Sequence, residues 1–209
     1  MQLKRVSNRG DLLEFIQFPY RLYKEDPNWV PPLLIDIKSK FNTGKNPFFE
    51  HARMKIFLAV AGGETVGRIV ALVNDNHNRT HDENIGFFGF FECVDDQKTA
   101  DALFQAAADY LKREGVTAIR GPADFSSNDE WGLLVDGYDK PPVILMPYNP
   151  RYYERLILNA GFAKKMDLYA FWMTQEEITD RVMRMAEIAR KRTKVRVRTL
   201  NMKDFDRVV

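Results

Sequence analysis

The feature that most limits the possible folds is an amphipathic helix that follows a nearly apolar segment. Residues 97–114 carry apolar side chains at helical spacing, and Gly115 is placed to end the helix. Before this helix, the nearly apolar run from Ile85 to Val94 is typical of a strand buried in the middle of a sheet. A helix of this kind among strands predicts an α/β fold. The apolar stripe comprises Ala100, Leu103, Phe104, Ala107, Ala108 and Leu111.

The other segments continue the alternation of strands and helices. Helical spacing predicts a first helix from Gly10 to Lys24, strained by Pro19, and two more at 33–40 and 150–159. Gly62-Gly63 between two apolar runs is a hairpin signal. The expected order is β-α-α-β-β-β-α-β-α-β. Its strands lie at 3–6, 55–61, 65–74, 85–94 and 116–120, with one or two closing strands within 162–173.

Length and composition favour a single domain with a short appendage, because the chain has 209 residues and 45% hydrophobic content. It contains no run of about 18 apolar residues, and Met1 to Gly10 has no apolar signal core. Cys93, the single cysteine, has no partner for an internal disulfide, which agrees with a reducing compartment. These observations predict a cytoplasmic protein without a transmembrane segment.

A basic run lies near the end of the chain. Residues 190–198 carry six cations and no acid, whereas the whole chain has a net charge of only +2. Clustered cations of this kind suit phosphate binding, but the run has no aromatic residue for base stacking. Its first half also lies where a helix C-terminus favours cations. We therefore predict no nucleic-acid partner.

A polar turn follows the strand at 116–120. Gly121-Pro122 ends strand pairing, and a polar run extends from Asp124 to Glu130. Short oxygen-bearing side chains either cap the turn by bonding neighbouring amides or point into a substrate cleft. Both interpretations stay open for Ser127 and Asn128.

The order of elements, with NPRYYERLILNAGF followed by KKMDLYAFWM, resembles the GCN5-related N-acetyltransferase (GNAT) superfamily. The segments DPNWVPPL, NPFFEHA, VGRIVALVND, GFFGFFE, SSNDEWGLLVDG and MPYNPRYY look more closely like a bacterial group of two-domain GNAT-like proteins. The resemblance implies a GNAT-like α/β fold over residues 1–174, with a central mixed, mostly antiparallel sheet flanked by helices. It also implies an acyl-CoA-dependent N-acyltransferase, with acetyl-CoA or a longer acyl-CoA as cosubstrate.

The resemblance also suggests where the cofactor would bind. The strand corresponding to residues 87–94 holds the pantetheine arm in the superfamily, which implies contacts with Phe91, Cys93 and Val94, and with Gln97 at the start of the next helix. A glycine-rich loop normally binds the pyrophosphate there, but residues 94–101 have no glycine and carry Asp95 and Asp96. These aspartates would repel a pyrophosphate, and we expect Asp95 to be the helix N-cap.

Acyl transfer to an amine needs a base and a donor for the developing negative charge. Glu92 is the candidate base, because desolvation on a central strand raises a carboxyl pKa; the alternative is a strand-end carboxylate in water. Ser127 and Asn128 are candidates for binding the acceptor or the developing charge. The superfamily's general-acid tyrosine falls at Ile157 here, so Tyr152 is the candidate acid, with Tyr153 as an alternative.

A metal site is not expected. The segment from Asp75 to Glu83 has two imidazoles four residues apart near carboxylates, a spacing that suits a metal if the segment is helical. Polar segments between strands are, however, usually solvated loops. We predict no metal.

The end of the chain suggests a further domain. Residues 195–209 echo residues 2–16, and residues 175–193 carry Ile178, Val182, Met185 and Ala189 on one helical face. We expect residues 175–193 to be a connecting amphipathic helix and residues 194–209 to begin a truncated second GNAT-like domain. The predicted function is N-acylation of a small amine or amino-lipid. The alternative is a non-catalytic scaffold or ligand-binding domain whose catalytic partner domain is missing from this chain.

Overall fold

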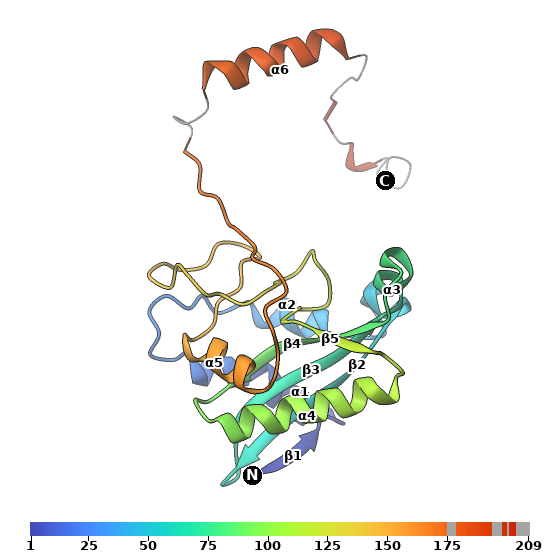
Figure 1. Cartoon of the computed structure of the whole chain (residues 1–209), viewed down its shortest axis with the longest axis vertical. Coiled ribbons are helices and arrows are strands. Elements are labelled where there is room, and N and C mark those ends of the chain that lie inside the picture. The colour runs from blue at the N-terminus through green and yellow to red at the C-terminus, as the bar shows by residue number, and fades with distance from the viewer. Residues whose placement is uncertain (175–178, 194–197, 200, 204–209) are drawn as a thin grey trace. The chain divides into compact units, whose positions relative to one another are not determined.

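The computed structural model describes residues 1–174, 179–193, 198–199 and 201–203. The chain divides into two compact units, residues 1–166 and residues 167–209. The first unit contains one five-stranded sheet with helices on both of its faces (Figure 1). This architecture confirms the predicted α/β class.

The strands follow one another across the sheet in chain order, from β1 to β5. β1, β2, β3 and β4 pair antiparallel with their neighbours, and β5 pairs parallel with β4. The sheet is therefore mixed and mostly antiparallel, as the resemblance implied. The bounds are β1 Gln2–Arg5, β2 Ala52–Ala61, β3 Glu64–Asn74, β4 Ile85–Cys93 and β5 Ala118–Arg120.

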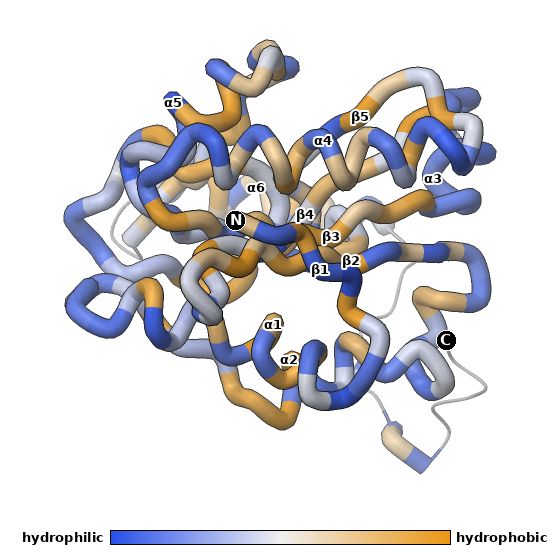
Figure 2. The backbone as a smooth tube through the Cα atoms, turned by 90° about the horizontal axis from the view of Figure 1, so that it is seen from below, coloured by the Kyte–Doolittle hydropathy of each residue, from blue (hydrophilic) through white to orange (hydrophobic). Residues whose placement is uncertain are grey.

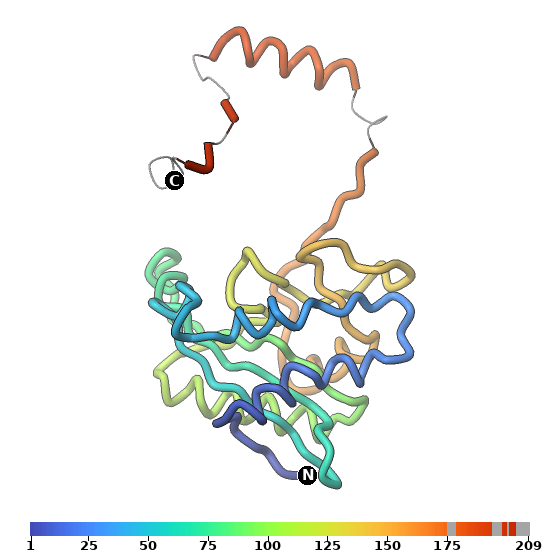
Figure 3. Tube along the Cα trace, turned by 180° about the vertical axis from the view of Figure 1, so that it is seen from behind, coloured from blue at the N-terminus to red at the C-terminus, as the bar shows by residue number. Residues whose placement is uncertain are grey.

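The helices divide between the two faces of the sheet. α1 (Arg9–Leu22) and α2 (Leu34–Lys40) cover the face seen from behind in Figure 3. α4 (Gln97–Arg113) and α5 (Tyr152–Asn159) lie on the opposite face. Figure 2 shows the strands between these layers, with apolar residues gathered along β3 and β4. The 3-10 helix η1 (Pro47–Glu50) precedes β2, and the short helix α3 (Asp75–His81) joins β3 to β4.

β3 shows why both layers are needed. Its side chains alternate, so that Ile69 and Ala71 join the core cluster beneath α4 and α5, whereas Val70 and Leu72 join the cluster beneath α1. All four residues are at most 1% exposed. A strand buried on both faces needs apolar side chains on both, so its sequence is a nearly continuous apolar run. This explains why apolar and polar residues do not alternate along β3 and β4.

A bulge in β4 changes which face its later residues occupy. The pairing with β3 shifts between Val70 and Arg68, and Phe90 adopts a left-handed φ of 49°. The Asp124 carboxylate accepts the Phe90 amide at 2.6 Å and so holds this conformation. Gly89 must be glycine, because a Cβ there would lie 2.0 Å from the Ala123 carbonyl oxygen.

The structure differs from the sequence-based expectations at two segments. The closing strands predicted within 162–173 are absent, and Phe171 and Trp172 are 90% and 83% exposed. Strand propensity is not sufficient there, because no described strand pairs with the segment. The segment after β3 was expected to be a solvated loop, but it forms α3, because Asn74 caps the His77 amide at 3.0 Å.

The second unit contains α6 (Asp180–Arg192), a helix within the predicted connecting segment. Its apolar residues Val182, Met183, Met185 and Ile188 are exposed within the described part of the chain. Ile178 and most of residues 194–209 lie outside the described residues, so the connecting role and the second domain stay predictions. Among the described helices, none is long and apolar enough to cross a membrane.

Candidate active site

The candidate base Glu92 lies near the end of β4 and is bonded to residues from three other elements. Tyr23, which follows α1, and Tyr153 of α5 each donate a hydroxyl to Glu92 Oε2 at 2.6 Å. Arg68 of β3 places Nη2 3.6 Å from Glu92 Oε1. The side chain of Glu92 is only 13% exposed. The structure therefore brings a nearly buried carboxylate, two phenols and a guanidinium together.

The bulge explains how Glu92 reaches these partners. Before the bulge, Phe88 points into the core beneath α4; after it, Phe90 points into the core beneath α1. Glu92, two residues beyond Phe90, lies on the same side as Phe90 because side chains alternate along a strand. Without the extra residue, Glu92 would point into the apolar core beneath α4.

Arg68 is the buried cation of this cluster, with a side chain 9% exposed. Its Nη1 donates to the Phe15 carbonyl at 2.9 Å, and its guanidinium lies 4.7 Å from the Phe15 ring centroid. Within the described part of the chain, Arg68 Nε has no hydrogen-bond acceptor. An orphaned buried donor costs about 1–3 kcal/mol, so the surrounding structure must compensate for it.

Burial sets the protonation of the cluster. Burial raises the pKa of Glu92, and the Arg68 charge and the two tyrosine hydroxyls oppose that rise. Burial and the Glu92 charge hold the pKa values of Tyr23 and Tyr153 well above their usual range. Both phenols therefore remain donors at neutral pH. A carboxylate with a raised pKa is better suited to accept a proton than an ordinary surface glutamate.

Asp124, in the polar run, is a second perturbed carboxyl group near Glu92. Burial and the nearby Glu130 charge raise its pKa to about 8. Its hydrogen bond from the Phe90 amide fixes the bulge that orients Glu92. Asp124 thus connects the polar turn to the base, a contact that the sequence did not predict.

α5 occupies the predicted pantetheine-binding edge at Cys93. The Cys93 amide donates to the Tyr153 hydroxyl at 2.7 Å, and Tyr152 donates to the Cys93 carbonyl at 2.7 Å. Phe91 packs its ring 4.6 Å from that of Phe104, and Val94 bonds back to the Val66 carbonyl at 3.0 Å. Burial raises the pKa of the Cys93 thiol to about 12, which makes it a poor nucleophile.

The start of α4 is also engaged. The N-cap is Asp96, which accepts the Thr99 amide at 3.0 Å; the expectation of Asp95 was wrong. Asp95 instead pairs with Arg155 of α5. Gln97 donates to the Leu156 carbonyl at 3.0 Å, so its described contacts fasten α4 to α5. Both aspartates therefore have structural partners: Asp96 caps α4, and Asp95 forms an ion pair with Arg155.

An open hollow of about 430 Å³ lies beside Tyr23. The loop after α1 contributes Asp26 to its lining, and the segment before α5 contributes Tyr148. Tyr148 donates to both Asp26 oxygens, at 2.8 and 2.7 Å, and its ring lies 6.0 Å from that of Tyr23. The hollow is therefore adjacent to the cluster around Glu92. Its other lining residues are Glu25, Pro27, Asn28, Tyr138, Asn149, Pro150 and Arg151.

Ser127 and Asn128 lie elsewhere. Ser127 lines a separate hollow of about 190 Å³, together with His77 and Trp131. Asn128 is exposed, and its amide donates to Ser126 Oγ at 3.2 Å, as expected for a capped turn. Among the described residues, neither of them forms a hydrogen bond or an ion pair with Glu92, and their proposed role in acceptor binding stays a prediction.

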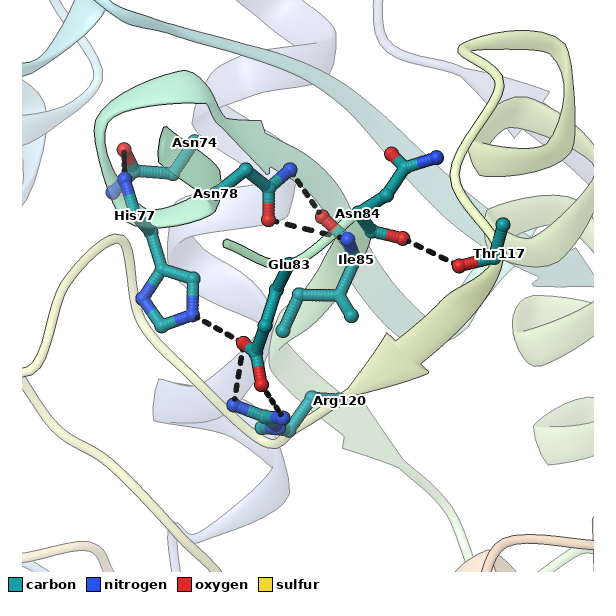
Figure 4. Close-up of polar contacts among 8 residues, drawn as sticks. All are labelled: Asn74, His77, Asn78, Glu83, Asn84, Ile85, Thr117 and Arg120. Carbon is teal, nitrogen blue, oxygen red and sulfur yellow. Dashed lines mark hydrogen bonds and ion pairs between the residues drawn. The ribbon is translucent and has the colours of Figure 1, made fainter. Parts of the chain in front are cut away.

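Glu83 forms a polar cluster at the opposite end of β4 (Figure 4). Arg120 donates to both of its oxygens, at 2.8 and 3.2 Å, and His77 Nε2 lies 2.9 Å from Oε2. The ring centroids of His77 and His81 are 4.5 Å apart. Three or more metal-ligating side chains do not converge anywhere among the described residues.

Sequence reasoning missed Tyr23, Arg68 and Asp124 as members of the site. Arg68 had a usable signal, since it is the one cation within the apolar run of β3. A charge in the middle of a buried strand needs a partner. Tyr23 gave no such signal, because it lies in the apolar pattern of the first predicted helix and so looked like an ordinary core residue.

No family model matches the chain. Protein YghO of Escherichia coli (strain K12) is 36% identical over 203 residues, covering 97% of this chain and 52% of that protein. The "bacterial ceramide synthase" of Caulobacter vibrioides is 37% identical over 211 residues, covering 98% of this chain and 53% of that protein. The chain thus spans about half the length of these curated relatives.

Solved structures show the fold. An aminoglycoside acetyltransferase from an uncultured soil metagenomic sample matches with a TM-score of 0.51 and 12% identity, over 83% of this chain and 95% of that one. An aminoglycoside 6'-N-acetyltransferase from Acinetobacter haemolyticus also has a TM-score of 0.51, with 11% identity, over 83% and 99%. Residues of the first unit have the fold of GNAT acetyltransferases, as the sequence resemblance implied.

Proposed function

We propose that the protein is an acyl-CoA-dependent N-acyltransferase and that Glu92 is its base. The main support is the position of Glu92: a nearly buried carboxylate with a raised pKa, near the end of β4, beyond the part of the strand that pairs with β5. The GNAT fold and the relative named a ceramide synthase support this reaction class. The acceptor is an amine, either a small molecule or an amino-lipid.

In the proposed reaction, the acceptor nitrogen attacks the thioester carbonyl carbon and the carbon–sulfur bond breaks. The nitrogen loses a proton to Glu92, and the leaving thiolate takes a proton from a phenol. Tyr152 is the proposed donor, because its hydroxyl lies beside the end of β4, where it bonds to the Cys93 carbonyl, and burial raises its pKa and so keeps the hydroxyl protonated at neutral pH. Tyr23 and Tyr153 orient the Glu92 carboxylate.

A specific observation favours the second candidate function, a non-catalytic domain. Tyr152 and Tyr153 already bond both main-chain groups of Cys93, and Asp96 already caps α4. A bound pantetheine arm would have to displace the tyrosines. If this arrangement persists, the domain acts as a scaffold, and a second GNAT-like domain carries the cofactor. The length of the two curated relatives, about twice that of this chain, supports the proposal of such a domain.

Calorimetric titration of the 209-residue chain with CoA and with short- and long-chain acyl-CoA distinguishes the two candidates. Saturable binding supports the catalytic candidate. A folded chain that binds none of these ligands supports the scaffold candidate.

Substitution of the base tests the mechanism. In any form of the protein that releases thiol from acyl-CoA when an amine is added, Glu92→Gln should lower turnover by at least about 100-fold, as expected for loss of a general base. Glu83→Gln is the matched control, because it alters a glutamate at the other end of the same strand and should retain turnover. Equal turnover in Glu92→Gln and the wild type would exclude Glu92 as the base.

A further inference from the structure

The hollow beside Tyr23 has one feature that neither candidate function explains. Asp26 is partly buried in its wall and accepts hydrogen bonds from the Tyr148 hydroxyl and, at 3.0 Å, from the Asn28 amide. These donors are neutral. Within the described residues, no Lys, Arg or His nitrogen lies within 4.0 Å of its carboxylate. Asp26 is therefore a carboxylate whose negative charge has no ionic partner.

Two cations lie nearby, one of them Arg151 in the lining of the hollow, and neither forms an ion pair with Asp26. The guanidinium of Arg151 lies over the Tyr138 ring, 4.3 Å from its centroid. Lys24 is 3.8 Å from Glu25, and both of those side chains are highly exposed. The hollow thus combines an unneutralised carboxylate with the ring of Tyr148, a combination that favours a cationic ligand through ionic and cation–π attraction.

The segments that line the hollow continue into exposed apolar residues. Val30, two residues beyond Asn28, is 55% exposed, and Met146, two residues before Tyr148, is 41% exposed. Ile144 is 90% exposed. The Tyr148 hydroxyl joins the two segments at the hollow, because it donates to both Asp26 oxygens. Val30 and Met146 are each two residues from a lining residue in the sequence, and they are the candidates for contact with an alkyl chain whose cation is at Asp26.

We infer that this hollow binds an aliphatic primary amine, with Asp26 as the counter-ion of its ammonium group and Tyr148 fixing the Asp26 carboxylate. The inference rests on the proposed function in one respect, since it takes the bound amine to be the acyl acceptor. Tyr23 connects the two regions: its ring contacts Tyr148, and its hydroxyl donates to Glu92. An amine captured at Asp26 is thereby placed beside the aromatic pair that adjoins the proposed base.

The test is a titration of the 209-residue chain with octylamine in the absence of any thioester, followed by calorimetry and by amide chemical shifts. Octylamine should bind saturably and shift the amides of Asn28 and Tyr138. 1-Octanol has the same chain without the charge and should bind at least about 10-fold more weakly, because it lacks the ionic contact. If the wild-type chain bound octylamine and 1-octanol with equal affinity, the inference would be overturned.

Two variants locate the contact. Asp26→Asn should weaken octylamine binding at least about 10-fold and leave octanol binding unchanged. Asp36→Asn, at an exposed carboxylate on α2, is the control and should bind like the wild type. A folded Asp26→Asn chain with wild-type affinity would overturn the assignment. Because no acyl-CoA is present, this titration tests the amine site alone. Saturable octylamine binding by a chain that fails to bind acyl-CoA in the separate calorimetric titration would count against the proposed function and leave this site in place.

Discussion

Two glutamates at opposite ends of β4 have opposite electrostatic environments. Glu83 precedes the strand and bonds to the Arg120 guanidinium and the His77 ring, and these contacts lower its pKa to about 2. Glu92 lies near the other end and bonds to two neutral phenols, and burial raises its pKa. The same residue type is thus held as a permanent anion at one end and as a proton acceptor at the other.

The difference comes from solvent access and from the type of partner. Glu83 is 31% exposed and has a cation in bidentate contact, so its charged form is favoured. Glu92 is 13% exposed, and its cation Arg68 is 3.6 Å away. Neutral donors orient a buried carboxylate without fully compensating its lost hydration. Such a group is a candidate for chemistry, whereas Glu83 is explained as a structural contact.

Removal of the cation beside each glutamate should have the largest effect on the free energy of unfolding. Arg68→Met leaves Glu92 buried without an opposite charge and should destabilise the fold by about 3–5 kcal/mol. Arg120→Met, the matched control at Glu83, should cause a much smaller loss, because water reaches that carboxylate. Chemical denaturation at pH 7 measures both changes. Equal losses would show that the two environments do not differ as described.

The phenols at the Glu92 end should have the next largest effect. Tyr153→Phe removes a buried hydroxyl that accepts from the Cys93 amide and donates to Glu92, and should destabilise the fold by about 1–3 kcal/mol. Tyr152→Phe removes one bond to the Cys93 carbonyl and should cost about 0.5–1.5 kcal/mol. Denaturation midpoints rank the two variants. A larger loss in Tyr152→Phe would contradict the central place of Tyr153.

The two glutamates should also give opposite dependences of stability on pH. Glu83 has a folded pKa below its unfolded value, so its contribution is present above about pH 4.3 and disappears as pH falls toward about 2. Glu92 has a folded pKa above its unfolded value, so stability is lost as pH rises from about 4.3 through the folded pKa.

Substitution by glutamine separates these two contributions. Glu83→Gln should destabilise the protein most above pH 5 and least near pH 2. Glu92→Gln should compare more favourably with the wild type at pH 8 than at pH 4, since it removes a buried charge. The free energy of unfolding across this range measures both trends. Parallel curves for the two variants would refute the assigned pKa directions.

The smallest expected effects concern the aspartates that follow β4. Asp96→Ala removes the N-cap of α4 and should cost about 1 kcal/mol. Asp95→Ala breaks an exposed ion pair with Arg155 and should change stability by less than about 1 kcal/mol. Thermal unfolding compares the two. A larger loss of stability in Asp95→Ala than in Asp96→Ala would indicate that Asp95, and not Asp96, caps α4.

The sequence was sufficient for elements whose own residues define them. α4 follows from its apolar stripe, and the hairpin of β2 and β3 follows from Gly62-Gly63, whose φ angles are 61° and 87°. The closing strands within 162–173 were wrong, because a strand needs a partner edge that its own sequence does not specify. α3 was missed for the opposite reason, since a side-chain cap overrode a polar composition.

The sequence by itself determined the order of the five strands and of α1, α2, α4 and α5, the buried character of β3 and β4, and the choice of Glu92 as the candidate base. These depend on local patterns, such as side-chain period and desolvation on an apolar strand. Only the tertiary structure decided the partners of Glu92. A single bulged residue at Phe90 turns Glu92 from one face of the sheet to the other, and the contacts with Tyr23, Arg68 and Tyr153 join positions 24 to 69 residues apart in the chain. Spacing within a sequence does not encode such contacts; the packing of helices on both faces of the sheet creates them.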